Sequence, residues 1–150
     1  MDACLLLTAD DVQRIIGEPL QKTVRTENAS AGLRFQRCLF SVPTEINSVA
    51  LALTLRGTGS DARNPRAFFE EKLEEYEHGG EEGEKEEHER ALDFVPGVGD
   101  RAVWFGTLAG GHLYVLKGDV LLEVLLGTTT QPAKLRDRAI EIGKVAAGRL

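Results

Sequence analysis

The sequence predicts an α+β protein in which an antiparallel β-sheet is flanked by helices. Segments that alternate apolar and polar residues follow one another across tight turns such as Gly118-Asp119, as in half-buried strands. Segments with helical apolar spacing stand near the start, in the middle and at the end of the chain. Because the strands are consecutive within each half, no parallel crossover is needed, and the predicted order is roughly α-β-β-α-β-β-β-α.

Capping signals mark the expected helices. Thr8 with Asp11 can cap a first helix, and Asn64 followed by Pro65 opens the central one. The expected helices are residues 9–16 ended by Gly17, a segment from Pro65 ended by Gly79-Gly80, and a terminal helix opened by residues 128–132.

The strands are placed by their alternation. Residues 18–32 are polar and predict a weak strand followed by a loop. Residues 33–42 and 49–55 predict a half-buried hairpin, whose second strand turns Ala50, Ala52 and Thr54 outward. The strands expected in the second half are a short one at 92–95 and longer ones at 102–107, 112–117 and 120–126. The last of these is apolar on both faces except at Glu123, which predicts a central strand covered by a helix.

Length and charge limit the classes of function. A chain of 150 residues with 42% hydrophobic content fits one domain over residues 1–150. Residues 70–90 hold eleven Glu against Lys72, Lys85 and Arg90, and the acidic loop is expected at about 79–90. The net charge of −6 leaves no basic face for nucleic acid or for an anionic membrane surface. No apolar run approaches the roughly 20 residues of a transmembrane helix, and residues 1–4 do not open a signal peptide.

Polar residues with catalytic potential are few, and we expect no catalytic, cofactor-binding or metal-binding site. Gly97 and Gly99 lead into a strand, whereas a phosphate loop leads into a helix, so they predict a turn. His78 and His88 bracket the acidic loop, which lacks the rigid framework of a metal site. His112 is expected at the surface or at a sheet edge.

Four aromatic residues lie in or beside the middle strands. Phe94, Trp104, Phe105 and Tyr114 could line an apolar ligand pocket between sheet and helices, or they could fill the core. Trp104 and Phe105 are adjacent on one strand, so their side chains must point to opposite faces. One of these two side chains therefore lies on the less buried side, unless both faces of the sheet are covered.

The two cysteines, Cys4 and Cys38, allow two interpretations. A disulfide would close a loop of about 35 residues and fix the N-terminal helix to the sheet. Two unrelated buried thiols in a cytosolic protein are the alternative, since free cysteine is among the most buried residue types. The residues alone leave both open.

A series of short motifs resembles a group of bacterial secreted and lipoprotein domains of unknown function. The opening Cys4-Leu5-Leu6-Leu7-Thr8 with Ile15-Ile16-Gly17 is similar to the start of that group, and Cys38-Leu39-Phe40 to a later strand. The turn from Gly97 to Trp104 and the hairpin from Leu113 to Asp119 follow in the same order. The group is similar in pattern to extracellular sensor-like domains of bacterial receptor kinases. The chain departs from it at Ala3, where the group has Pro, and in the acidic insert at 81–89.

The resemblance implies a Cys4–Cys38 disulfide, a helix-flanked antiparallel sheet and a place in the cell envelope or outside the cell. It implies no activity. We therefore expect a non-enzymatic exported module, sensor-like or accessory, that binds a small ligand or an envelope protein. Its export signal or lipid anchor, the one expected link to a membrane, would lie outside this chain. The alternative is a cytoplasmic acidic protein that binds and inhibits a basic protein, with both cysteines reduced.

Overall fold

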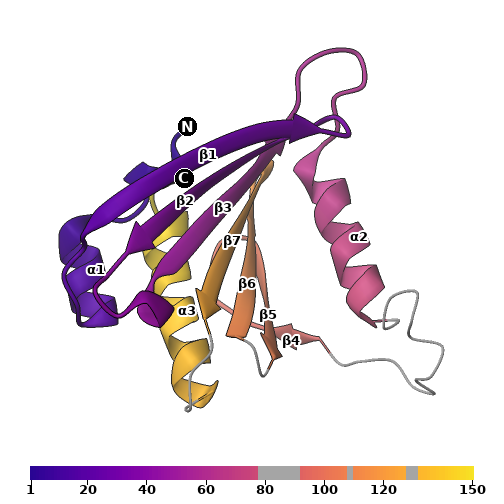
Figure 1. The fold of residues 1–150 in the computed structure, drawn as a ribbon. Helices are drawn as coiled ribbons and strands as arrows, with labels where there is room; N and C mark the ends of the chain where they lie inside the picture. The colour runs from indigo at the N-terminus through magenta and orange to yellow at the C-terminus, as the bar shows by residue number, and fades with distance from the viewer. Residues whose placement is uncertain (78–91, 108–109, 128–131) are drawn as a thin grey trace.

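The computed structural model describes residues 1–77, 92–107, 110–127 and 132–150. In chain order the elements are η1 (Ala3–Leu5), α1 (Ala9–Ile16), β1 (Lys22–Ser30), β2 (Leu33–Ser41), η2 (Glu45–Asn47), β3 (Val49–Arg56), α2 (Pro65–Glu77), β4 (Asp93–Phe94), β5 (Arg101–Thr107), β6 (Gly110–Lys117), β7 (Val120–Gly127) and α3 (Pro132–Ala147). Figure 1 shows their arrangement. None of the helices in the described ranges is both long and apolar enough to span a membrane.

The strands form one seven-stranded sheet in the order β1-β2-β3-β7-β6-β5-β4. Neighbouring strands are antiparallel at every pairing, which confirms the predicted α+β class. The strands of the first half and those of the second half each form a consecutive run. The ladder between β3 and β7 joins the two runs in the middle of the sheet.

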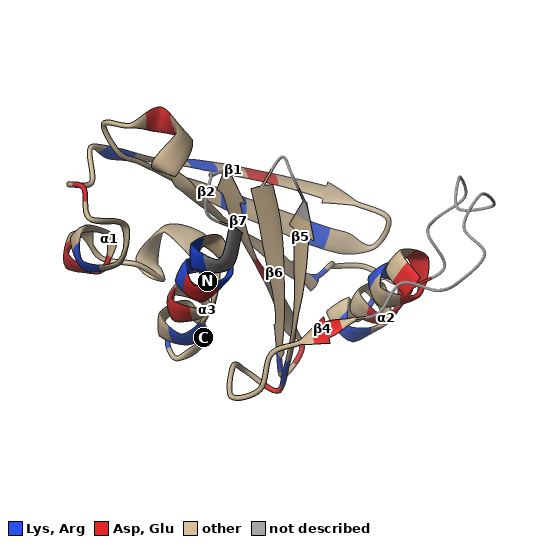
Figure 2. Cartoon of the chain, turned by 90° about the horizontal axis from the view of Figure 1, so that it is seen from below, with Lys and Arg blue, Asp and Glu red and all other residues tan. Residues whose placement is uncertain are grey.

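The two faces of the sheet are covered unequally. One face, called here the covered face, carries Cys38, Leu51 and Leu122 and packs under η1, α1 and α3. The other, called here the open face, carries Leu39 and Leu125, and α2 packs over only part of it. Figure 2 shows α1 and α3 on one side of the sheet and α2 on the other.

The first helix follows its predicted bounds because its caps are local. The Thr8 hydroxyl accepts from the Asp11 amide at 3.1 Å, and the Asp11 carboxylate accepts from the Thr8 amide at 2.8 Å. Gly17 ends the helix with a φ of 87°. Burial raises the pKa of Asp11, but the Arg149 guanidinium and the Thr8 amide outweigh it and hold that pKa well below its ordinary value.

The other two predicted helices are also confirmed. Asn64 accepts from the Arg66 amide at 2.8 Å and so caps α2, which begins at Pro65. The predicted stop at Gly79-Gly80, like His78, His88 and the acidic loop at 79–90, lies outside the described residues. The terminal helix runs over the predicted region as α3 and packs through Leu135, Ala139 and Ile142.

Two expectations about strands were wrong. Residues 22–30 form one continuous strand, β1, rather than a weak strand and a loop, and all nine side chains are exposed, so no apolar alternation marks them. A two-residue turn at Ala31 and Gly32, with φ of 53° and 80°, joins β1 to β2. Ala50 and Thr54 lie on the outward face, as expected, but both are buried rather than exposed. Larger side chains flank them, Leu39 and Leu125 beside Ala50 and Phe35 and Leu121 beside Thr54.

The cysteine pair predicted from the resemblance is present in the structure. The sulfur atoms of Cys4 and Cys38 lie 2.11 Å apart, at disulfide distance, and join η1 to β2 on the covered face. The buried Gln36 side chain supports the same junction: its amide oxygen accepts from the Ala3 amide, and its amide nitrogen donates to the Met1 carbonyl at 2.8 Å. The N-terminal segment is thus held by a covalent link and by a buried amide beside it.

Candidate functional site

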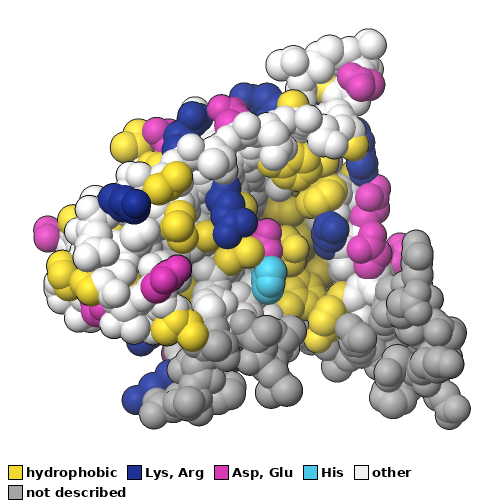
Figure 3. All heavy atoms as spheres, in the orientation of Figure 1, with side chains coloured by type: hydrophobic (Ala, Val, Ile, Leu, Met, Phe, Trp, Pro, Cys, Tyr) yellow, Lys and Arg dark blue, Asp and Glu magenta, His cyan; other side chains and the backbone are white. Residues whose placement is uncertain are grey.

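The open face is organised in rows that cross the strands. One row runs through Val24, Leu39, Ala50, Leu125, His112 and Phe105 on successive strands. The next runs through Thr26, Arg37, Ala52, Glu123, Tyr114 and Val103. Phe69 and Leu73 of α2 pack on the end of these rows at β5. Toward β1 no described helix covers the open face. Figure 3 shows hydrophobic side chains gathered over the middle of this face, with charged side chains around them.

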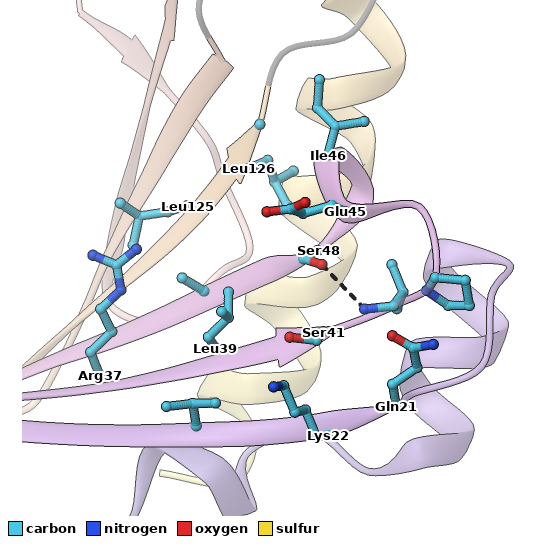
Figure 4. A pocket seen from close by; sticks show the side chains of 15 residues that line it. Gln21, Lys22, Arg37, Leu39, Ser41, Glu45, Ile46, Ser48, Leu125 and Leu126 are labelled. Carbon is cyan, nitrogen blue, oxygen red and sulfur yellow. Dashed lines mark hydrogen bonds between the residues drawn. The ribbon is translucent and has the colours of Figure 1, made fainter.

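A hollow of about 950 Å³ occupies the uncovered end of this face. Its walls come from the ends of β1, β2 and β7 and from η2. Ala50 is small and stands between Leu39 and Leu125, so the floor dips along β3 and is apolar, whereas the walls are partly polar. Figure 4 shows the lining side chains, with Ile46 and Glu45 of η2 at one end and Gln21 and Lys22 at the other.

Two cations border this hollow. In Figure 4 the Arg37 side chain runs from β2 toward Leu125 of β7, whereas Lys22 stands on the β1 side. Within the described ranges neither cation has an ion pair or a side-chain hydrogen bond. Among the described residues of the lining, Glu45 is the one acidic side chain. A guanidinium beside an apolar floor is suited to pair with a carboxylate or phosphate, because its fork of donors matches their oxygen atoms.

A polar cluster of His112, Glu123 and Tyr114 adjoins the hollow in the middle of the sheet. His112 Nδ1 is in contact with Glu123 Oε2 of the neighbouring strand. The His112 side chain is 45% exposed on β6, a strand inside the sheet, so it reaches the surface but not the edge. Burial raises the pKa of Tyr114, and the neighbouring Glu123 carboxylate, to which Tyr114 is hydrogen-bonded, raises it further.

This cluster is satisfied by its own members. The Glu123 carboxylate is engaged by two side chains of the neighbouring strand, and the Tyr114 ring also meets Phe105 edge-on, with centroids 5.3 Å apart. Tyr76 of α2 meets Phe105 at 4.4 Å. The His112 side chain is the exposed member of the cluster, next to Leu125 of the hollow in the same row of the sheet.

The structure brings only two of the four predicted aromatic residues together. Phe105 and Tyr114 are in contact on the open face. Trp104 lies on the covered face, and its ring packs so closely on Gly111 that a Cβ there would meet it at 2.1 Å. Phe94 is half exposed on β4, with the Arg101 guanidinium 5.7 Å from its ring centre.

The four therefore do not line one pocket, and a ligand-binding role for any of them stays a prediction. Trp104 and Phe105 do point to opposite faces, as expected, and both are buried because helices cover the sheet on both sides at this point. The predicted turn at Gly97 and Gly99 is present, with both residues at positive φ. No group of three or more potential metal-ligating side chains comes together among the residues that the structure describes.

Sequence reasoning missed the residues that form the hollow. Arg37 and Leu39 lie in a predicted strand, Lys22 in the segment predicted as a weak strand and a loop, and Ala50 on the face predicted outward. The one available signal was Glu123, the single charge in an otherwise apolar strand. Its partners could not be named, because pairing between β6 and β7 decides which residues stand opposite it.

Comparisons with protein-family models, with curated proteins and with solved structures find no match. The class that the fold itself defines is an α+β protein with a seven-stranded antiparallel sheet, of which one face is covered and the other is partly open. The open face, with its hollow, its unpaired cations and its polar cluster, is the candidate functional site.

Proposed function

We propose that this protein is an exported domain of the cell envelope that binds a ligand in the hollow of the open face and acts as a non-enzymatic, sensor-like module. The single observation that carries the binding site is the hollow of about 950 Å³ with an apolar floor, partly polar walls and two cations at its border that are unpaired in the described structure. Ligand sites are typically concave and mostly apolar, with a few polar groups that orient the ligand. The satisfied polar cluster beside it contains no activated nucleophile, which favours binding over catalysis.

Export is supported by the cysteine pair and by the motif resemblance. A Cys4–Cys38 disulfide is compatible with an oxidising compartment, because cytosolic reductants keep most thiols reduced. Thiol labelling of the denatured protein, taken from its native host without reductant, tests the proposal. We expect no labelling of either cysteine until a reductant is added. Labelling of both would remove the main support for export and favour the cytoplasmic alternative, whose acidic segment at 70–90 is described only over residues 70–77.

The ligand that the hollow fits best has an apolar body and one acidic group. Leu39 and Leu125 are partly exposed, so an acyl chain lying over them would remove apolar surface from water. The carboxylate of such a chain would then pair with the Arg37 guanidinium, which has no partner in the described structure.

A fluorescence titration with cis-parinaric acid, a naturally fluorescent fatty acid, tests this assignment. The oxidised protein is expected to bind the probe saturably at one site. Arg37→Gln is expected to weaken binding about tenfold, the loss of one charge-assisted hydrogen bond. Ala50→Leu is expected to reduce the affinity for the probe further, because the larger side chain fills the floor of the hollow.

Lys144→Gln is the matched control, since it removes one exposed positive charge from α3, on the other side of the sheet. It should bind the probe as the unchanged protein does. The ligand assignment fails if no saturable binding is seen, or if Arg37→Gln and Lys144→Gln behave alike while both keep the thermal stability of the parent.

A further inference from the structure

The strand β1 is a long edge of the sheet with nothing paired to its outer side among the described residues. It spans nine residues, Lys22 to Ser30, and pairs with β2 over its whole length. The opposite edge, β4, has only two residues. Natural sheets usually block long edges, because the unpaired amides and carbonyls are a template for another strand.

The turn at Ala31 and Gly32 decides which backbone groups of β1 point outward. Positive φ at both positions defines the two-residue turn in which the flanking pair, Ser30 and Leu33, exchanges hydrogen bonds. Alternate residues then bond to β2, and the residues between them direct their amides and carbonyls away from the sheet. The outward residues are Thr23, Arg25, Glu27 and Ala29.

Two of these outward residues carry opposite charges. Arg25 Nη2 lies 3.1 Å from Glu27 Oε1, and the two side chains are 42% and 36% exposed. Arg25 also lies 3.4 Å from Asp2, and Glu27 lies 3.8 Å from Arg34. Such solvated ion pairs contribute little to stability, so they can be exchanged for equivalent pairs with a second molecule at small cost.

The charges make this edge complementary to itself in one antiparallel register. With a two-fold axis at Thr26, Arg25 stands opposite Glu27 of the second copy, and Glu27 opposite its Arg25. Thr23 then faces Ala29, so all four outward residues form hydrogen-bonded pairs. An axis at Arg25 or at Glu27 would instead place like charges opposite each other, which is destabilising.

We propose that β1 is a homodimerisation edge, on which a second copy of this chain adds its own β1 antiparallel, centred on Thr26. The two-fold axis is perpendicular to the sheet, because the Thr26 side chains of both copies lie on the same face. The two open faces are therefore on the same side of a continuous sheet. Lys22 and Val24 of β1 line the hollow, so each hollow borders the dimer contact.

Charge reversal tests the register. Arg25→Glu gives an edge with two acidic outward residues, and Glu27→Arg gives one with two basic residues. Each single variant is expected to be a monomer by sedimentation equilibrium of the oxidised protein at low salt, where the unchanged protein is a dimer. An equimolar mixture of the two is expected to form a heterodimer, and the double variant R25E/E27R to form a homodimer again.

A backbone variant tests the strand pairing separately from the charges. Ala29→Pro removes an outward amide hydrogen, so it is expected to weaken the dimer. Because proline is tolerated at a sheet edge, the thermal stability of the monomer is expected to remain unchanged. A wild-type protein that is a monomer throughout the accessible concentration range would overturn the proposal. A dimer that persists in both single charge variants would overturn it as well. These outcomes are independent of the ligand proposed above, because the readout is molecular mass.

Discussion

Reducing the Cys4–Cys38 disulfide is expected to lower the free energy of unfolding by about 4 kcal/mol. The two cysteines are separated by 34 positions in the sequence, and the chain-entropy cost of closing such a loop in the unfolded state sets this magnitude. Domains of this size are stable by roughly 5–15 kcal/mol, so the change is a large share of the total. The fold should nevertheless persist, since the buried Gln36 amide still holds the N-terminal segment.

Urea unfolding with and without reductant measures the effect. Trp104 is the only tryptophan and is buried, so its fluorescence reports the unfolding of the sheet. With an m-value of about 2 kcal/mol/M, the midpoint is expected to fall by about 2 M on reduction.

The double variant Cys4→Ala/Cys38→Ala is the control. Its midpoint should lie near that of the reduced protein and should not respond to reductant. An unchanged midpoint on reduction of the parent protein, with reduction verified by mass, would refute the reasoning that this link stabilises the fold.

Two further predictions concern the packing around α1 and β6. Asp11→Asn is expected to cost about 2 kcal/mol at neutral pH, because the carboxylate caps α1 and accepts from Arg149. Since the pKa of Asp11 is depressed in the folded state, its contribution to stability is complete above the ordinary value of 3.8 and is lost as pH falls below it. Equal melting temperatures of the parent protein and the variant at pH 7 would contradict this prediction. Gly111→Ala is expected to cost about 1–3 kcal/mol by pushing on the Trp104 ring. Gly148→Ala, where the nearest atom is 3.3 Å from the added Cβ, should cost clearly less in the same melting assay.

The parts of the fold that could be predicted are those encoded by neighbouring residues. Thr8 and Asp11 lie three positions apart and cap each other, so α1 could be bounded from the sequence. The apolar residues on both faces of β7, with Glu123 as the one exception, placed a covered central strand correctly. The strand β1 could not be found this way, because an edge strand with every side chain exposed has no apolar period.

The candidate site could not be predicted because its residues meet through pairing between distant strands. Arg37 and Leu125 belong to opposite halves of the chain and come together only through β3, which pairs with both β2 and β7. The surroundings of the aromatic residues could not be predicted for the same reason. Alternation placed Trp104 and Phe105 on opposite faces, but it does not reveal that α3 covers one face and α2 the other.

The central place of the β3–β7 ladder has a consequence for how the chain folds. Each half can form its hairpins from contacts that are short in sequence, whereas partners such as Val49 and Leu126 are more than about 70 residues apart. Forming that ladder has the largest entropic cost of loop closure, so we expect it to be the late, rate-limiting step of folding. The disulfide lies wholly within the first half of the chain, so it does not shorten the loop between β3 and β7. Oxidation is thus expected to slow unfolding more than it speeds the union of the two halves.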